Sequence, residues 1–241
     1  MVTGSQVHLV RHAESVHNVT KDFSKLDPSL TSLGFEQAAE LGKSFPYAGR
    51  VGVVITSPLR RAIQTALTAF SGILDKQYFD SSSGQGVENG ASLIIEPLLQ
   101  ERSALACDTG SDRAELEKAF PRLTFDGLGD AWPSKDGIFA ADDEAVQERA
   151  RKVRRGLVEQ GEKSNSGEKT DFVVVTHGVF MKFLAEEPEI DLPKAGWKSY
   201  TIQKVSPEEV NLVSVATEIC PETNVRSNKV MSTYQFYRIH V

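Results

Sequence analysis

The stretch VHLVRHAESVHN, residues 7–18, carries the strongest signal for both fold and function in this chain. Its first four residues favour β-structure, and Arg11, His12 and Glu14 follow almost directly. Titratable side chains are costly to bury unless they are paired. A strand that surfaces into a loop is the simplest explanation of this cluster. The alternative is a strand whose end holds Arg11 and His12 at a site of reaction.

Two further runs resemble this first strand, which we expect over residues 6–12. They are RVGVVITS (50–57) and DFVVVTH (171–177), and both are short, β-branched and continuously apolar. Continuous apolar runs are typical of strands that are covered on both faces. Helical patterns separate them at 29–45 and 58–74. Strands that alternate with helices predict an α/β protein, here a three-layer α/β/α sandwich with a mostly parallel central sheet.

The predicted helices carry recognisable end signals. Thr31 or Ser32 is a plausible N-cap for the first, and Pro58 lies near the first turn of the second. A third helix is expected over 142–163, where acidic residues come early and basic residues late, as the helix dipole prefers.

The remaining segments are less regular. The Gly/Ser-rich stretch 80–92 and the polar stretch 164–171 are expected to be loops. The segment 102–142 lacks strong periodicity, and we expect a partly helical insertion that covers a site. The C-terminal runs predict one or two edge strands; they are WKSYTIQKV (197–205), VNLVSVATEI (210–219) and TYQFYRIHV (233–241). One domain over 1–241 is the expected organisation.

Composition narrows the classes of function. The 241 residues carry 27 basic and 33 acidic side chains, a formal net charge of −6 that argues against general nucleic-acid binding. Cys107 and Cys220 are too few for a disulfide framework. No apolar stretch approaches the roughly 20 residues of a membrane span, and the N-terminus lacks the basic region of a signal peptide. We therefore expect a soluble cytoplasmic protein with no membrane or nucleic-acid partner.

Two of the buried strands end in histidine, at His12 and His177. Ligands of open α/β sheets gather beyond the carboxyl ends of the strands, so the two side chains could face each other there. The second strand ends at the same edge, which puts Arg60 and Arg61 in the first turn of the following helix. That placement opposes the helix dipole, and residues that break a local rule tend to cluster at functional sites. Guanidinium groups bind phosphate oxygens in bidentate fashion, and a neutral imidazole can attack phosphorus.

Five ordered segments resemble the histidine phosphatase superfamily, in its phosphoglycerate mutase-like branch. They span about residues 6–183; in order they are LVRHAESVHN (9–18), DPSLTSLGFEQAAELG (27–42), SPLRRAIQTA (57–66), LLQE (98–101) and VVTHG (174–178). Each segment alone is weak evidence, but five in the correct order are specific. The resemblance implies a phosphoglycerate mutase-like fold with a single histidine phosphatase domain.

The resemblance also implies roles for individual residues. His12 would be the nucleophile that becomes phosphorylated, while Arg11, Arg61 and His177 would bind the phosphoryl oxygens and stabilise the transition state. Arg61 matches the family's arginine because it directly precedes Ala62. Further substrate contacts would come from Asn18 and Gly178.

Two acidic residues compete for the role of general acid and base. Glu101 ends the LLQE segment and is the favoured residue, whereas Asp108, in ACDTGS, matches a eukaryotic phosphomutase-like branch with a Cys-Asp pair. The acid must hold a proton near neutral pH and reach the leaving oxygen. His12 must be unprotonated to attack, and the like charges of Arg11 and Arg61 oppose its protonation.

The implied activity is a phosphomonoesterase that acts on a small phosphorylated substrate. Phosphoglycerate mutase chemistry and a non-catalytic phosphate-binding protein on the same scaffold are the alternatives. The chain lacks the Tyr-Gly pair that family mutases carry after the glutamate, since it reads ERSALACDTGS. A zinc site built from His12, His17 and His177 lacks the expected ligand spacing. No metal or organic cofactor is expected, because the arginines and His177 supply the positive charge.

The substrate and the oligomeric state are not indicated. Specificity would come from segments 19–27, 78–92 and 102–143, the least readable parts of the chain. Their aromatic residues could form an apolar pocket wall, although core packing is the more frequent use of such side chains; they are Phe23, Phe125, Trp132 and Phe139.

Overall fold

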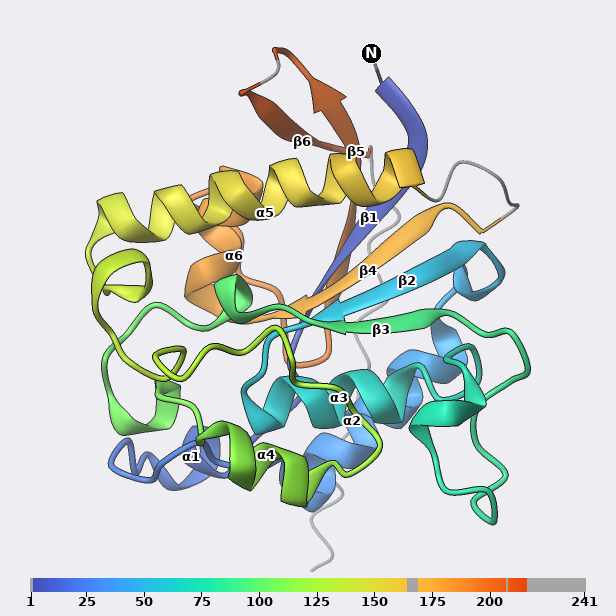
Figure 1. The fold of residues 1–241 in the computed structure, drawn as a ribbon, viewed down its shortest axis with the longest axis vertical. Coiled ribbons are helices and arrows are strands. Elements are labelled where there is room, and N and C mark those ends of the chain that lie inside the picture. Colours follow the sequence, from blue (N-terminus) through green and yellow to red (C-terminus); the bar gives the residue numbers. More distant parts are fainter. Residues whose placement is uncertain (1, 164–168, 207, 216–241) are drawn as a thin grey trace, which may run out of the picture.

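A six-stranded sheet with helices on both faces forms the centre of the molecule (Figure 1). The computed structural model describes residues 2–163, 169–206 and 208–215. The strands are β1 (Val2–Arg11), β2 (Val51–Thr56), β3 (Ser92–Ile95), β4 (Asp171–Thr176), β5 (Trp197–Lys204) and β6 (Val210–Ser214). They lie in the order β3-β2-β4-β1-β5-β6; β3, β2, β4 and β1 are mutually parallel, while β5 is antiparallel to both β1 and β6. The mostly parallel sheet is as predicted.

The helices of the described residues range from five residues in α1 to 21 residues in α5. They are α1 (Val16–Thr20), α2 (Ser32–Ser44), α3 (Arg60–Ala69), α4 (Arg113–Ala119), α5 (Asp143–Lys163) and α6 (Gly178–Ala185). Short 3-10 turns also occur, at Ala48–Arg50, Lys76–Tyr78, Pro97–Leu99, Ala106–Asp108 and Gly137–Phe139. Figure 1 shows α5 and α6 on one side of the sheet and α2 and α3 on the other.

The alternation of side chains along β4 explains the two covered faces. All six residues of β4 are buried. Phe172 and Val174 belong to the core beneath α5 and α6, whereas Val173 and Val175 belong to the core beneath α2 and α3. Successive residues of a strand point to opposite faces, so a continuous apolar run needs cover on both. The predicted α/β/α sandwich is confirmed.

The strand boundaries differ from the predictions in three places. β1 begins at Val2 rather than near residue 6, because its pairing with β5 extends from Val10 back to Val2. β3 was not predicted; it is a four-residue edge strand that follows the predicted loop 80–92, and four residues carry little periodicity. β5 is not an edge strand, since it lies between β1 and β6. Of the C-terminal runs, residues 216–219 and 233–241 lie outside the described residues.

Two of the predicted helix starts are visible in detail. Thr31, one of the two suggested N-caps, accepts a hydrogen bond from the Gly34 N–H at 2.9 Å. In α3 the helix begins at Arg60, after Pro58, and Leu59 occupies the cap position with no side-chain bond. A distant residue serves this end instead: the buried Asp27 carboxylate accepts the Arg60 N–H at 2.9 Å. The acidic group thus satisfies a free donor at the helix start.

The segment 102–142 packs on α3 through a third apolar cluster. The cluster joins residues of α3 and its N-terminal cap to residues of the segment; its buried members are Leu59, Ile63, Leu116, Phe125, Leu128 and Trp132. Phe125 and Trp132 are therefore core residues and not part of a pocket wall. Phe23 remains 47% exposed. In the described parts of the chain, no helix combines the length and the apolarity needed to cross a bilayer.

Close helix packing gives a testable prediction about stability. A Cβ atom added at Gly42 in α2 would lie 2.0 Å from the carbonyl oxygen of Ala69, where α3 ends. A Cβ added at Gly156 in α5 would meet no atom within 4 Å. We expect Gly42→Ala to lower the free energy of unfolding by about 1–3 kcal/mol through overpacking. Gly156→Ala should raise it by about 0.5–1 kcal/mol through helix propensity.

Urea unfolding of the two variants and the wild type provides the measurement. The paired substitution is its own control, because both exchange glycine for alanine inside a helix. Equal stability changes in the two variants would show that α2 does not approach α3 this closely.

Candidate active site

His12 and His177 lie side by side at the carboxyl edge of the sheet, with their rings tilted by 53°. The parallel register pairs Arg11 of β1 with Thr176 of β4, so each histidine is the next residue along its strand. Their ring centroids are 5.1 Å apart. Both side chains are buried, with exposed fractions of 3% for His12 and 0% for His177. The topology thus brings together two residues that are 165 positions apart.

The hydrogen bonds of His12 define its neutral tautomer. The Nδ1 atom lies 2.7 Å from the carbonyl oxygen of Ala13, which can only accept, so Nδ1 carries the proton. The Nε2 atom is left with its lone pair and accepts a hydrogen bond from Nε of Arg61 at 3.3 Å. A lone pair on Nε2 is what nucleophilic attack requires.

Burial keeps both histidines unprotonated. It lowers the pKa of His12 well below 6.5, and the positive charges of Arg61, Lys194 and, to a smaller degree, Arg11 lower it further. Burial is also the first cause of the lowered pKa of His177, followed by Arg61. The sequence had indicated only the like charges, whereas removal of the imidazole from water is the larger effect.

Arg61 is buried in the centre of the site. It is 1% exposed, and its Nη2 atom forms an ion pair with Oδ1 of Asp108 at 2.7 Å. Its Nη1 atom donates to the carbonyl oxygen of Cys107 at 2.6 Å. Arg60 instead donates to the hydroxyl of Ser111 at 3.0 Å and turns away from His12. Of the two adjacent arginines, Arg61 is therefore the one that lies in the site.

Arg11 lies against the start of α6. Its Nη1 atom donates to Asp191 at 2.8 Å and also to the carbonyl oxygen of Leu192. A Cβ at Gly178 would lie 3.0 Å from Nη2 of Arg11, so only glycine lets the guanidinium approach this closely. The buried Nε of Arg11 has no hydrogen-bond partner among the described residues.

The two acidic residues occupy different surroundings. The Glu101 carboxylate accepts backbone N–H groups of Val179 at 3.1 Å and Phe180 at 2.9 Å in the first turn of α6, and that of Arg102 at 2.8 Å. The Asp108 carboxylate is held by Arg61 and by the hydroxyl of Ser103, the latter at 2.6 Å. Each carboxylate therefore adjoins a different member of the histidine–arginine cluster.

Asn18 contacts the site indirectly. Its Oδ1 accepts the Ser15 N–H at 3.1 Å, and its Nδ2 lies 2.9 Å from Nε2 of His17. His17 in turn has its ring centroid 6.4 Å from that of His12 and 6.4 Å from that of Phe23. Burial is the first cause that lowers the pKa of His17 to about 4. Among the described residues, Asn18 makes its side-chain hydrogen bonds to Ser15 and His17 and not to His12, so its side chain orients His17.

Three residues of the site were not identified from the sequence. The Ser57 hydroxyl lies 2.8 Å from Nε2 of His177, at the end of β2. Lys135 donates to Oε1 of Gln100 at 2.6 Å and to the carbonyl oxygen of Glu101 at 3.0 Å. Lys194 acts on both histidines by its charge. Only Ser57 could have been identified from the sequence, because it directly follows the second predicted strand at the edge of the sheet where the other two strands end. The register of β2 and β4 confirms this position.

One group of metal-ligating side chains lies beside the site. One ligand atom each of His17, Cys107 and Asp108 lies within 4.8 Å of the others. Asp108 is already paired with Arg61, and burial raises the pKa of the Cys107 thiol to about 11. Metal binding needs the thiolate, so these residues do not form a well-prepared site.

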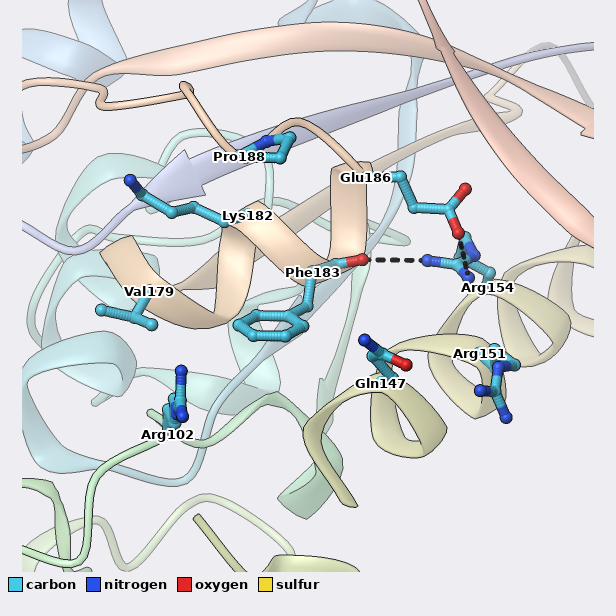
Figure 2. Close-up of a pocket in the computed structure, with 9 residues that line it drawn as sticks. All are labelled: Arg102, Gln147, Arg151, Arg154, Val179, Lys182, Phe183, Glu186 and Pro188. Atoms are coloured by element: carbon cyan, nitrogen blue, oxygen red, sulfur yellow. Dashed lines mark hydrogen bonds and ion pairs between the residues drawn. The ribbon is translucent and has the colours of Figure 1, made fainter. Parts of the chain in front are cut away.

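A separate cavity lies between α5 and α6 on the outer side of the α6 helix (Figure 2). Its volume is about 620 Å³, and its lining includes Arg102, Arg154, Val179 and Phe183. Arg154 joins the two helices by donating to the Phe183 carbonyl and to Glu186, each at 3.0 Å. The cavity shares one turn of α6 with the site, since Val179 lines it while the Val179 N–H binds Glu101. Neither catalytic histidine candidate lines it.

Comparison with known proteins identifies a family and its fold. The family model described as "Histidine phosphatase superfamily (branch 1)" matches residues 7–77 and 83–217. A Schizosaccharomyces pombe protein named a probable phosphatase is 27% identical over 78% of this chain and 83% of its own length. A phosphoglycerate mutase-like protein of Arabidopsis thaliana is 28% identical over 73% of this chain and 68% of its own.

Two solved structures share the architecture. A mycobacterial glucosyl-3-phosphoglycerate phosphatase in complex with VO3 has a TM-score of 0.55 at 17% identity and covers 90% of this chain and 100% of its own. A mycobacterial hydrolase has a TM-score of 0.53 at 18% identity, with 88% and 99% covered. At these identities the likeness is one of fold.

The pKa of His17 gives a prediction about the pH dependence of stability. The folded protein binds this proton only near pH 4, whereas an unfolded histidine binds it near pH 6.5. Between these values the unfolded state holds more protons, so the free energy of unfolding falls as the pH is lowered from about 6.5 to about 4. His17→Gln removes this contribution.

Urea unfolding of wild type and His17→Gln across pH 8 to 4 measures the effect. The difference in the free energy of unfolding between the two proteins should be constant above pH 7. Below pH 6.5 the wild type should lose stability relative to His17→Gln. A difference that stays constant down to pH 4 would contradict the burial of a neutral His17.

Proposed function

The chain belongs to the histidine phosphatase superfamily, and from this premise we propose that it hydrolyses phosphomonoesters through a phosphohistidine on His12. Phosphatase activity is the broader statement, supported by the family match and by relatives and structural neighbours that are named phosphatases. The observation that carries the finer proposal is the neutral tautomer of His12, whose Nε2 lone pair faces Arg61 with His177 alongside.

In the first step, Nε2 of His12 attacks phosphorus and the bond from phosphorus to the ester oxygen breaks. The departing oxygen takes a proton from the general acid and leaves as an alcohol. In the second step, water attacks the phosphohistidine, the phosphorus–nitrogen bond breaks, and the same acidic residue accepts the proton of the water. Inorganic phosphate then leaves, and Nε2 regains its lone pair.

The positive groups around His12 would bind the phosphoryl oxygens. Arg61 and Arg11 supply guanidinium donors, and Arg11 retains a buried Nε without a partner among the described residues. His177 lies within the same cluster, and Ser57 fixes its orientation through Nε2. The Nδ1 atom of His177 is buried and unpartnered in the described structure, so it is available to a phosphoryl oxygen. Gly178 begins α6, and because Val179 and Phe180 donate to Glu101, the Gly178 N–H would be the donor of this helix start to the phosphoryl group. Because these groups supply the positive charge, the cycle requires no metal or organic cofactor.

Glu101 is the proposed acid and base. Asp108 is committed to an ion pair with Arg61, and a carboxylate in that position serves as the counter-ion of the guanidinium. The Glu101 carboxylate accepts only backbone N–H groups among the described residues, and it lies at the α6 turn that follows His177. Proton transfer to the leaving oxygen thus falls to Glu101, with Asp108 as the alternative.

Hydrolysis is favoured over mutase chemistry by the segment after Glu101. A mutase must exclude water while its intermediate reorients, and the Tyr-Gly pair of family mutases is missing here. The non-catalytic alternative is disfavoured by the complete set of His12, Arg61, Glu101 and His177. The proposed partner is a small phosphorylated substrate, of the kind for which the mycobacterial glucosyl-3-phosphoglycerate phosphatase is named.

Turnover of p-nitrophenyl phosphate tests the nucleophile. We expect His12→Ala to lower kcat/KM by at least about 1,000-fold, because no other side chain can take over covalent catalysis. A phosphorylated histidine should be trapped by rapid quenching in the wild type and be absent from the variant. Equal turnover by both proteins would eliminate the proposed mechanism.

Supplying 3-phosphoglycerate in the same assay separates hydrolysis from isomerisation. Release of free phosphate is the expected result, whereas formation of 2-phosphoglycerate would assign mutase activity.

The dependence on the leaving group distinguishes the two acidic residues. A general acid contributes about 10²–10⁴-fold, and chiefly when the leaving oxygen is basic. Glu101→Gln should therefore lower kcat/KM far more for glycerol 3-phosphate than for p-nitrophenyl phosphate. Asp108→Asn should lower both to a similar extent, because it disturbs Arg61. The reverse pattern would identify Asp108 as the acid.

A further inference from the structure

A strained turn lies directly beside the proposed nucleophile. Pro193 and Gly196 close the turn, with the Gly196 N–H donating to the Pro193 carbonyl at 2.9 Å. Ala195, the third residue of the turn, has a φ of 58°. Residues other than glycine seldom adopt this left-handed conformation. Such conformations cost about 1 kcal/mol or more and persist where the surrounding structure imposes them. Lys194 occupies the corner of this turn.

The turn is fastened to the strand that carries the nucleophile. The Arg11 N–H donates to the Gly196 carbonyl at 2.9 Å, and the Ala195 N–H makes a longer contact with the His12 carbonyl at 3.5 Å. The preceding residues Asp191 and Leu192 bind the Arg11 side chain. The backbone of Lys194 is therefore fixed relative to both Arg11 and His12.

The Lys194 ammonium is partly buried and has no hydrogen-bond or ion-pair partner among the described residues. The two arginines of the site have acidic partners, since Arg61 pairs with Asp108 and Arg11 pairs with Asp191, and Lys135 donates to Gln100 and to the Glu101 carbonyl. The charge of Lys194 reaches His17 more strongly than that of Lys21, which is four residues from His17 in sequence. Lys194 thus adds a positive charge that has no hydrogen-bonded or ion-paired partner among the described residues and that acts on His12 and His17.

We propose that Lys194 binds a second anionic group, a carboxylate or a phosphate, on the alcohol part of the substrate. This inference rests on the proposed phosphatase function, because it specifies the class of phosphomonoester that is accepted. The phosphoryl group is already served by Arg11, Arg61, His177 and the start of α6. A further cation without a partner, held in place by a strained turn, is suited to recognising a second negative charge.

Lys194 loses its charge at a moderately alkaline pH, and with the charge it would lose the ability to bind a second anion. Burial, Arg11 and Arg61 lower the pKa of Lys194 to about 8, while Glu101 and Asp191 act in the opposite direction. Lys194 also acts by its charge on His12, His17 and His177, whose pKa values are lowered first by burial and which are neutral above pH 7. Lys194 is charged below pH 8, so the preference for a second anion should be present there and decline above it.

Two matched substrate pairs measure this preference. 3-Phosphoglycerate and glycerol 3-phosphate differ by a carboxylate against a hydroxymethyl group, and 1,3-propanediol bisphosphate and 3-hydroxypropyl phosphate differ by one phosphate. The ratio of kcat/KM within each pair reports recognition of the second anion alone. The two pairs also distinguish a carboxylate from a phosphate as the preferred group.

We expect Lys194→Met to reduce this ratio by about tenfold or more for the preferred pair, as for loss of one charge-assisted hydrogen bond. Lys43→Met, an exposed lysine near the end of α2, is the control and should leave the ratio unchanged. Equal losses for both members of each pair, or no loss, would overturn the proposal.

Lys194→Arg provides a second variant that keeps the charge. In the wild type the ratio should fall between pH 7 and pH 9.5, whereas in Lys194→Arg it should persist to pH 9.5. A purely structural role for Lys194 would give the two proteins the same pH dependence, which would count against the proposal. The arginine variant also shows whether the turn tolerates substitution.

Binding measurements separate this inference from the proposed function. Calorimetric titration of His12→Ala with 3-phosphoglycerate and with glycerol 3-phosphate requires no turnover. Adding Lys194→Met in that background should weaken 3-phosphoglycerate binding selectively. If selective binding persists in an inactive wild type, the phosphatase proposal fails while the anion site stands; if turnover occurs without selectivity, the reverse holds.

Discussion

The parallel pairing of β1 with β4 is the constraint on which the site depends. Arg11 lies opposite Thr176 in this register, so His12 and His177 leave the sheet side by side. A slip of one residue would turn the buried side chains of β4 to the wrong faces and separate the two imidazoles. The other end of β4 fixes the register, because the buried Asp171 accepts the Gln6 N–H of β1 at 3.0 Å and pairs with Arg50, just before β2, at 2.8 Å. Polar contacts at one end of the sheet thus hold the reactive groups in place at the other.

Burial of the two histidines also keeps their imidazole rings neutral. Removal from water lowers the pKa values of His12 and His177, and nearby cations lower them further. Two acidic residues partly balance this positive charge. Asp108 forms an ion pair with Arg61, and Asp191 forms one with Arg11. The resulting site keeps its imidazoles neutral while it remains attractive to an anion. Attraction of a phosphoryl group and readiness for nucleophilic attack therefore have one common origin.

The sequence predicted the layers and the histidine pair because these follow from strand periodicity and from the rule that parallel strands end at one edge. It did not predict β3, which is too short to show a pattern, or the extension of β1 back to Val2 alongside β5. Within the site, His12, His177 and Arg61 lie at or just after strand ends and were found, whereas Lys135 and Lys194 lie in irregular segments. Their approach to the site depends on long-range packing, which no local spacing records. For the same reason, the sequence did not decide whether Phe125 and Trp132 are core residues. They are buried in a cluster that segment 102–142 forms with Leu59 and Ile63.

Asp108 connects the resting arrangement of charges with the proposed reaction. Its pair with Arg61 holds the guanidinium beside His12 when no substrate is bound, and Ser103 fixes the second carboxylate oxygen. A phosphoryl group that enters the site must share or replace this partner and must displace the Arg61 N–H from the lone pair of His12. Phosphate oxygens can accept both of these donors, so the exchange conserves hydrogen bonds while it frees Nε2 for attack. In the proposed reaction, Arg61 would therefore cover the lone pair of His12 in the free protein and expose it when its own donors turn to the substrate.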